Sequence, residues 1–330
     1  MIQTIYIERG IESHPRAQRI LARFDDAEKI LCDRYGEIFN LKSQNFRLQK
    51  QNPALILAHK HDGHVLPAPE GYGVGSQENY YFSHMLNCIY DCRYCFLQGM
   101  YQSAHYVVFI NYEDITDSIT ERSSQLKNQT PWFFSGYDCD SLAFEPITGF
   151  MQHCLSIFEN IPHAWLEIRT KSTQVRSLLS RSAINNVVVA FSFTPSDFSR
   201  RFEHGVPDIH KRIKAMQMLQ SKGWKIGLRF DPIMAYHDYQ ASYQDMFELI
   251  FSRLDNALIH SVSMGEFRMP KGFFKKIKKL YPEEALYHLY MDDNDGMKSF
   301  NRSLEQSMFD FCRLQLLRWM PEHKLFNCSI

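Results

Sequence analysis

Three cysteines lie close together in the segment NCIYDCRYCFLQ, and their thiolates could bind iron. Cys88, Cys92 and Cys95 follow a CxxxCxxC spacing. Cysteine thiolates hold [4Fe–4S] clusters, and ferredoxin-type clusters use four of them. If no fourth protein ligand comes from elsewhere, three cysteines leave one iron with an open coordination site. The spacing therefore favours a [4Fe–4S] cluster with one iron that can bind a further molecule.

Two other interpretations of these cysteines stay open: part of a zinc site, or three buried small hydrophobic residues. A structural zinc site takes four ligands in paired steps, and the sequence holds no second close pair of cysteines. The motif, with Tyr94 and Phe96 on either side of Cys95, resembles that of radical S-adenosylmethionine enzymes. In those enzymes the open iron chelates the methionine moiety, and an electron from the cluster splits the sulfonium to give a 5′-deoxyadenosyl radical. The expected cofactors are therefore a [4Fe–4S] cluster and S-adenosyl-L-methionine.

Composition and charge are those of a soluble globular protein. The 330 residues are 45% hydrophobic and 22% charged, enough to bury a large core. No apolar run approaches the roughly 18 residues of a membrane span, and the first residues do not form a signal peptide. We therefore expect a cytoplasmic protein with no membrane partner, whose eight cysteines are reduced thiols or ligands. The formal net charge of zero gives no support for DNA binding, and the basic clusters at 200–214 and 271–279 are typical of solvated helix faces.

Short apolar runs alternate with amphipathic segments through the middle of the chain. This alternation predicts parallel βαβ units. Six units are too few for a closed (β/α)8 barrel. They suit an α/β fold of the partial (β/α)6 type that radical S-adenosylmethionine enzymes use, with the cysteines in the loop after the first strand. The predicted strands are 80–86, 132–136, 164–170, 187–193, 225–231 and 257–263, and the amphipathic segments are 143–158, 173–182, 207–222 and 240–254.

Three regions are predicted along the chain. Residues 1–78 form an N-terminal α/β extension with a helical stretch at 15–35. Residues 79–264 form the partial barrel. Residues 265–330 form a C-terminal segment with a lysine-rich helix, an acidic hairpin-like turn and a closing helix near 302–319.

Longer segments resemble the spore photoproduct lyase family of radical S-adenosylmethionine enzymes, from about Tyr80 to the final helix. This resemblance implies a lyase that reverses a methylene-bridged thymine dimer in DNA by hydrogen-atom abstraction. The implied partners are damaged DNA and an electron donor such as flavodoxin or ferredoxin. The segments are ENYYFSHMLNCIYDCRYCFLQ, VVFINYEDI and FEHGVPDIHKRIKAMQMLQSKGWKIGL.

The resemblance also implies roles for five residues outside the cysteine triplet. Cys139 would give a hydrogen atom to the product radical, and Tyr94 would belong to a tyrosine relay that returns it. Ser141, Lys171 and Ser192 match positions that hold S-adenosylmethionine in the family.

Three features depart from the family pattern. Phe96 stands where the family has a second relay tyrosine, and a phenyl ring has no O–H bond. The segment DDNDGMKSF replaces a hairpin in which an Arg-Tyr pair enters the duplex, and its carboxylates would repel phosphates. Asp231 stands where the family has a small apolar residue in the dimer pocket. These departures keep two alternatives open: radical chemistry on another substrate, and a non-catalytic iron–sulfur sensor or nucleic-acid-binding protein.

Overall fold

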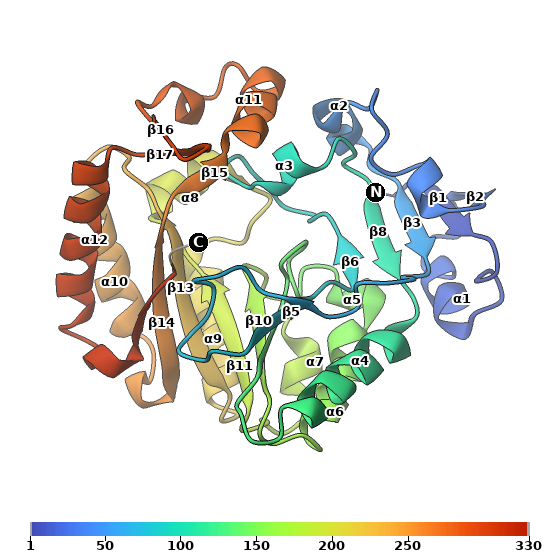
Figure 1. The fold of residues 1–330 in the computed structure, drawn as a ribbon, viewed down its shortest axis with the longest axis horizontal. Helices are drawn as coiled ribbons and strands as arrows, with labels where there is room; N and C mark the ends of the chain where they lie inside the picture. The colour runs from blue at the N-terminus through green and yellow to red at the C-terminus, as the bar shows by residue number, and fades with distance from the viewer. Residues whose placement is uncertain (1, 329–330) are drawn as a thin grey trace.

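The structure, a computed structural model, describes residues 2–328 and contains a curled eight-stranded sheet (Figure 1). The strand order is β18-β14-β13-β11-β10-β9-β5-β4, and the six central strands from β5 to β14 are mutually parallel. They occur in the order that the sequence predicted, which confirms the partial barrel. Their bounds are β5 (Asn79–Phe82), β9 (Trp132–Ser135), β10 (Trp165–Thr170), β11 (Val187–Ser192), β13 (Lys225–Ile233) and β14 (Ile259–Glu266). The predicted strand 80–86 is divided, because the barrel strand ends at Phe82 and residues 85–86 pair within the second sheet.

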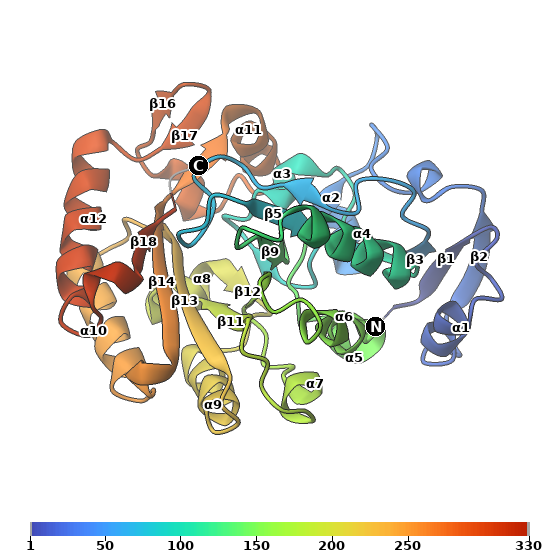
Figure 2. The ribbon, with the colours of Figure 1, turned by 60° about the horizontal axis from the view of Figure 1, so that its bottom comes forward.

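Helices cover the outer face of this sheet (Figures 1 and 2). Strand β11 shows why, because all six of its residues, VVVAFS, are buried. Val187 and Val189 join the large cluster that contains helix residues, whereas Val188 points into a second cluster on the inner face. A strand buried on both faces reads as a continuous apolar run. The helices are α4 (Tyr112–Gln125), α5 (Glu145–Thr148), α6 (Phe150–Phe158), α7 (Arg176–Leu179), α8 (Ser196–Phe202), α9 (Ile209–Gln220) and α10 (Tyr239–Phe251).

The inner face carries charge as well as apolar side chains. Glu167 of β10 and Arg229 of β13 are fully buried and form a two-bond ion pair, with N–O distances of 2.7 and 3.1 Å. Arg169 lies 3.1 Å from the same carboxylate. A buried pair of this kind is tolerated because the two charges and their hydrogen bonds satisfy each other. Tyr72, from the loop between β4 (Leu66–Pro67) and β5, packs edge-on against Phe134 and fills the space beside this network.

The N-terminal region builds a second, five-stranded sheet in the order β2-β1-β3-β8-β6. Two of its strands, β6 and β8, come from beyond residue 78, so the chain crosses between the two sheets. The helix predicted at 15–35 is wrong in its second half. Helix α1 ends at Leu21, and residues 28–32 form β2, paired in parallel with β1. The bounds are β1 (Thr4–Glu8), α1 (Pro15–Leu21), β2 (Glu28–Cys32), α2 (Phe46–Gln51), β3 (Leu55–Ala58), β6 (Met85–Leu86) and β8 (Tyr106–Phe109).

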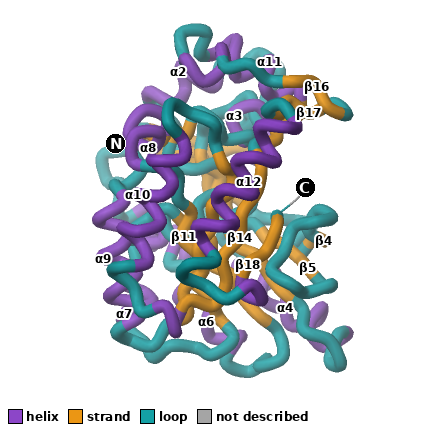
Figure 3. The backbone as a smooth tube through the Cα atoms, turned by 90° about the vertical axis from the view of Figure 1, so that its left-hand side faces the viewer, coloured by secondary structure: helices purple, strands orange, loops and turns teal. Residues whose placement is uncertain are grey.

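The C-terminal region follows the predicted order of helix, turn and helix. Asp295 and Gly296 take positive φ values of 48° and 80° and connect the two strands of the hairpin. Figure 3 shows the closing helix α12 beside α10, on the outside of the barrel. The bounds are β15 (Arg268–Pro270), α11 (Lys271–Leu280), β16 (Asp292–Asn294), β17 (Met297–Ser299), α12 (Arg302–Leu316) and β18 (Leu325–Asn327), and 3-10 turns lie at Tyr35–Glu37, Asn256–Leu258, Ala285–His288 and Glu322–Lys324.

One of the three carboxylates of the hairpin, that of Asp293, is paired with lysines. Asp293 lies 2.8 Å from Lys271 and 2.7 Å from Lys298, so its carboxylate is paired on both sides. The negative charge of Asp293 is therefore compensated locally by these two lysines. No helix within residues 2–328 is long and apolar enough to cross a membrane.

Candidate cluster and cofactor site

The three cysteines lie on one loop between the two sheets. The loop leaves β6 through Asn87, whose φ of 68° turns the chain and whose side-chain amide donates to the carbonyls of Ser103 and His105 at 2.7 and 2.8 Å. Cys92 lies in β7 (Asp91–Cys92), which pairs with β12 (Glu203–His204) in a short antiparallel ladder. Helix α3 (Leu97–Met100) starts directly after the motif. The loop is therefore held at the carboxyl edge of the barrel sheet by residues far away in sequence.

All three thiols are free, and burial works against their ionisation. It raises the pKa of Cys88 to about 12 and that of Cys92 well above its ordinary value, while Lys171 opposes the rise at Cys92. The charges of Cys95 and Cys88 also raise the pKa of Cys92, which shows that the thiols lie within electrostatic reach of one another. A ligand thiol must be deprotonated, so nearby cations or bound iron have to offset this cost.

These residues fit an iron–sulfur cluster by their chemistry: three free thiols on one loop, with lysine ammonium groups beside them. Within residues 2–328, no group of three His, Cys, Asp or Glu side chains is arranged to hold a metal ion. A cluster distributes its ligands over several irons, and its cysteines need not converge on one point.

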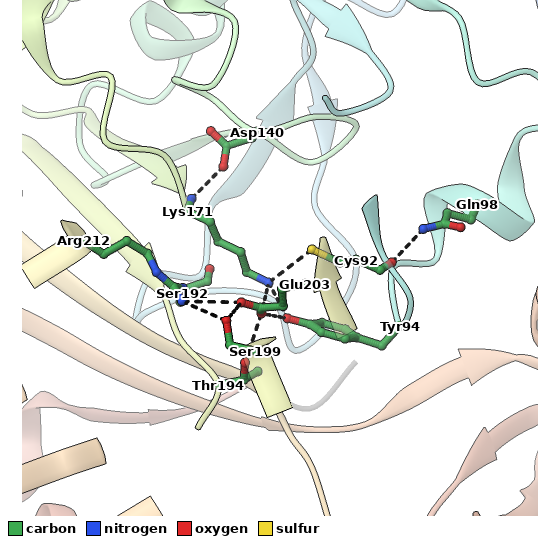
Figure 4. A network of polar contacts seen from close by, with 10 residues as sticks. All are labelled: Cys92, Tyr94, Gln98, Asp140, Lys171, Ser192, Thr194, Ser199, Glu203 and Arg212. Carbon is green, nitrogen blue, oxygen red and sulfur yellow. Dashed lines mark hydrogen bonds and ion pairs between the residues drawn. The ribbon is translucent and has the colours of Figure 1, made fainter. Parts of the chain in front are cut away.

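A buried polar network connects Lys171 to the loop (Figure 4). The ammonium group of Lys171 lies 2.8 Å from Oε1 of Glu203 and 3.9 Å from the sulfur of Cys92. It also donates to the hydroxyl of Tyr94, which itself donates to Glu203. Lys171 and Tyr94, two residues that the sequence singled out, are thus brought together with Cys92.

Glu203 is the centre of this network. Besides Lys171 and Tyr94, its carboxylate accepts hydrogen bonds from Thr194 at 3.1 Å and Ser199 at 2.6 Å, and Arg212 lies 3.5 Å away. Burial alone would raise the pKa of Glu203, but the two cations outweigh it and hold the pKa at about 2. The carboxylate therefore stays charged at neutral pH.

Arg212 corrects one expectation from the sequence. It belongs to the basic cluster at 200–214, predicted to be a solvated face, yet its side chain is fully buried. It donates to the carbonyl of Ser192 at 2.7 Å and lies 4.8 Å above the ring of Phe193. The charge is buried because Glu203 compensates it.

Cys139 lies in the loop after β9, opposite the cysteine loop. It is 6% exposed, and burial raises the pKa of its thiol well above the ordinary value, with Cys88 among the charges that add to the rise. Asp140 fixes this loop, because one carboxylate oxygen accepts from the backbone N–H groups of Leu142 and Ala143 and the other accepts from that of Lys171 at 2.6 Å. The loops after β9 and β10 are therefore linked.

The two serines have different surroundings. The hydroxyl of Ser141 lies 2.6 Å from that of Ser135 and is fully buried, so it is committed to holding its own loop. Ser192, at the end of β11, is 8% exposed, and its hydroxyl has no hydrogen-bond partner within the part of the chain that the structure describes. Of the two, only Ser192 presents a free polar group.

Tyr94 and Cys139, the residues for which the resemblance implies hydrogen return, lie in different core clusters. Tyr94 belongs to the barrel core cluster, whereas Cys139 belongs to the cluster beneath the N-terminal sheet. The ring of Phe96 lies 5.8 Å from that of Tyr137, which stacks on Tyr81 at 4.3 Å. A phenol therefore lies beside Phe96 although Phe96 has none.

Asp231 points into the barrel interior. Its Oδ2 accepts a hydrogen bond from Ser263 at 2.7 Å and lies 3.9 Å from Arg169. Its Oδ1 is buried and has no hydrogen-bond partner among residues 2–328. Burial raises the pKa of this carboxyl, and Arg169 opposes the rise. Asp231 is thus a polar group with capacity for one more donor.

Sequence reasoning missed three residues that organise the site: Glu203, Asp140 and Lys50. Lys50, on α2, donates to the carbonyls of Cys88 and Tyr90 at 2.6 and 3.1 Å. Glu203 lies in the Phe-Glu-x-Gly block that carried the resemblance, and Asp140 directly follows Cys139. The sequence therefore offered a local clue to both residues. Lys50 had none, because nothing in its local sequence indicates contact with a loop 38 residues away.

Comparison with known proteins gives the family. The sequence profile described as "Spore photoproduct lyase" matches residues 76–306, more than half of the chain. The chain belongs to the spore photoproduct lyase family. The spore photoproduct lyase of Bacillus subtilis is 22% identical over 86% of this chain and 83% of its own, and that of Clostridium acetobutylicum is 19% identical over 87% and 84%. A solved spore photoproduct lyase variant with bound AdoMet and dinucleoside spore photoproduct superposes with a TM-score of 0.86 at 15% identity, covering 99% of this chain and 98% of its own. At that identity the likeness shows the fold.

Proposed function

We propose that this protein is a radical S-adenosylmethionine lyase that repairs a methylene-bridged thymine dimer in DNA. The curated relatives are named spore photoproduct lyase, and one solved neighbour is complexed with dinucleoside spore photoproduct. The observation that carries the proposal is the placement of three free cysteines on one loop at the carboxyl edge of six parallel strands. Cys139 and Lys171 come to the same edge from the loops after β9 and β10.

Cys88, Cys92 and Cys95 would hold a [4Fe–4S] cluster, which together with S-adenosylmethionine supplies a hydrogen-abstracting 5′-deoxyadenosyl radical when bound. Lys171 donates to Glu203, Tyr94 and the sulfur of Cys92, which holds its ammonium group at the cysteine loop, where a carboxylate or ribose oxygen of the cofactor would accept from it in place of the long 3.9 Å contact to sulfur. Ser192 would form a hydrogen bond with S-adenosylmethionine through its free hydroxyl. Ser141 acts by holding the loop that carries Cys139, through its bond to Ser135.

Cys139 supplies the hydrogen atom that completes the product. Its S–H bond breaks, a C–H bond forms at the product radical, and a thiyl radical stays on the sulfur. The raised pKa keeps the thiol protonated at neutral pH, which this step needs. An external one-electron donor such as flavodoxin or ferredoxin would reduce the cluster, and we infer a cytoplasmic setting, where such donors occur.

The same radical chemistry on a different substrate is the second candidate. Phe96 removes a phenol, and the free Oδ1 of Asp231 would accept a hydrogen bond from a substrate donor. A third candidate, a non-catalytic iron–sulfur protein, leaves the free hydroxyl of Ser192 and the placement of Cys139 without use.

One assay separates these candidates. Reduced, reconstituted protein is incubated with S-adenosylmethionine and, in parallel, dinucleoside spore photoproduct, a cyclobutane dimer or undamaged DNA. We expect 5′-deoxyadenosine and repaired dithymidine from spore photoproduct alone. Release of 5′-deoxyadenosine without repair would favour another substrate. Cys88→Ala is the negative control and should release no 5′-deoxyadenosine. If the wild type also releases none, the non-catalytic protein is favoured.

The role of Cys139 has its own test. Cys139→Ala should still release 5′-deoxyadenosine but give adducts at the unquenched product radical. Cys154→Ala is the matched control, because Cys154 is also buried but lies on α6, outside the site. Clean dithymidine from Cys139→Ala would remove the hydrogen-donor role.

A further inference from the structure

Lys50 reaches the cysteine loop from the N-terminal sheet region. Its ammonium group donates to the carbonyl oxygens of Cys88 at 2.6 Å and Tyr90 at 3.1 Å, and lies 5.4 Å above the ring of Tyr106. These two carbonyls flank the first turn of the motif. One side chain therefore holds the backbone on both sides of Ile89 and fixes the direction in which the Cys88 thiol leaves the loop.

The helix that carries Lys50 is itself anchored on two sides. Arg47 donates to the carbonyl of Leu280 at 2.8 Å and pairs with Glu283 at 2.6 Å. The side chain of Gln49 accepts from the backbone N–H of Ala104 at 2.9 Å, just beyond the cysteine loop. Helix α2 is thus fixed between the C-terminal region and the end of the loop, and Lys50 extends from a defined base.

The charge of Lys50 is not cancelled. Within residues 2–328, Lys50 forms no ion pair with a carboxylate, and its hydrogen bonds go to neutral carbonyls. Burial lowers the pKa of Lys50. The nearby groups that oppose this shift, and so favour the charged ammonium, are the sulfurs of Cys88, Cys95 and Cys92 and the carboxylate of Asp91. Lys50 is thus a half-buried cation beside three cysteines, without an ion-paired carboxylate among the described residues. Its positive charge would attract a cluster that places negative charge on those sulfurs.

We propose that Lys50 is a positioning residue for the cysteine loop, and that its positive charge stabilises the bound cluster, most strongly in the reduced form. The inference rests on the proposed cluster assignment and extends it. It makes the N-terminal region part of the cluster site, because the barrel alone supplies the cysteines but not this cation.

Three variants separate the hydrogen bonds from the charge. Lys50→Met removes both, Lys50→Gln keeps a donor and removes the charge, and Lys50→Arg keeps both. Lys42→Met is the matched control, because Lys42 is exposed in the same region and forms no ion pair with any residue from 2 to 328. Far-ultraviolet circular dichroism checks that each variant folds.

The first measurement uses the protein without a cluster and is independent of catalysis. Hydrogen exchange of the backbone amides at 87–95 should be about 10-fold faster in Lys50→Met than in wild type or Lys42→Met, since the loop loses two tethering bonds worth about 1.4 kcal/mol together. Lys50→Arg should match wild type. Equal exchange rates in Lys50→Met and Lys42→Met would overturn the positioning role.

The second measurement uses reconstituted protein. Lys50→Met should lose iron to a chelator about 10-fold more readily than wild type, as expected for an outer partner of a metal site. Its cluster midpoint potential should shift to a more negative value, as should that of Lys50→Gln, whereas Lys50→Arg should stay close to wild type. An unchanged potential in both neutral variants would overturn the electrostatic role. Wild type that binds no cluster would contradict the proposed function itself, while the exchange result would still decide the positioning role.

Discussion

Two lysines lie on opposite sides of the cysteine loop, and their surroundings differ. Lys171 comes from the barrel and is bound to Glu203, so its charge is compensated within a buried network. Lys50 comes from the N-terminal region and donates to two backbone carbonyls, and among the described residues no carboxylate forms an ion pair with it. The barrel side therefore holds its lysine in a buried ion-pair network, whereas the N-terminal side brings to the loop a lysine that has no carboxylate partner within residues 2–328. The two lysines therefore have different electrostatic roles, because one is ion-paired and the other is bound to backbone carbonyls.

The largest effect on the free energy of unfolding is expected when the ion-pair network around Glu203 is broken. Glu203→Gln leaves Lys171 and Arg212 buried without a counter-charge. Breaking a buried pair in this way costs about 3–5 kcal/mol of the free energy of unfolding. Urea unfolding of the protein without a cluster measures it, with Glu283→Gln, an exposed pair, as the control. A loss equal to that of the control would show that the network does not stabilise the barrel.

Acid should weaken the barrel through a second compensated group. Arg229 and Arg169 outweigh the effect of burial and hold the pKa of Glu167 at about 2, below the ordinary value of 4.5. A lowered pKa contributes stability above about pH 4.5, and this is lost as the pH falls towards 2, in total about 3 kcal/mol. The free energy of unfolding of Glu167→Gln should therefore fall less steeply with acid than that of wild type. Identical slopes over this range would contradict the assignment.

The smallest effect tests whether Tyr94 serves structure or hydrogen return. Tyr94→Phe removes one donor to Glu203 but leaves Lys171 in place, and should cost about 1 kcal/mol of the free energy of unfolding. If Tyr94 also returns the hydrogen atom, this variant consumes more S-adenosylmethionine per repaired dimer than wild type. The ratio of 5′-deoxyadenosine to product measures this, and an unchanged ratio would limit Tyr94 to the network.

Patterns over a few neighbouring residues predicted the features that depend on those residues alone. The six parallel strands and the cysteine loop follow from apolar runs and from spacing, and they occur in the expected order, although the predicted strand 80–86 is divided between the two sheets. The helix predicted at 15–35 is wrong in its second half, because the segment EKILC pairs with β1 as a strand. This long-range pairing overrides the helical composition of the neighbouring residues. The division of the chain at residue 78 stays a prediction, although β6 and β8 pair across it.

The sequence by itself determined the three thiols, the order of the strands, and the residues from which a cofactor site could be built. Only the tertiary structure decided which charges are compensated. Arg212 is buried because Glu203 lies opposite it, and Lys50 approaches Cys88 because the N-terminal sheet packs beside the loop. The physical reason is that periodicity reports the neighbours of a residue along the chain. The free energy of a buried charge depends instead on partners that folding brings from elsewhere.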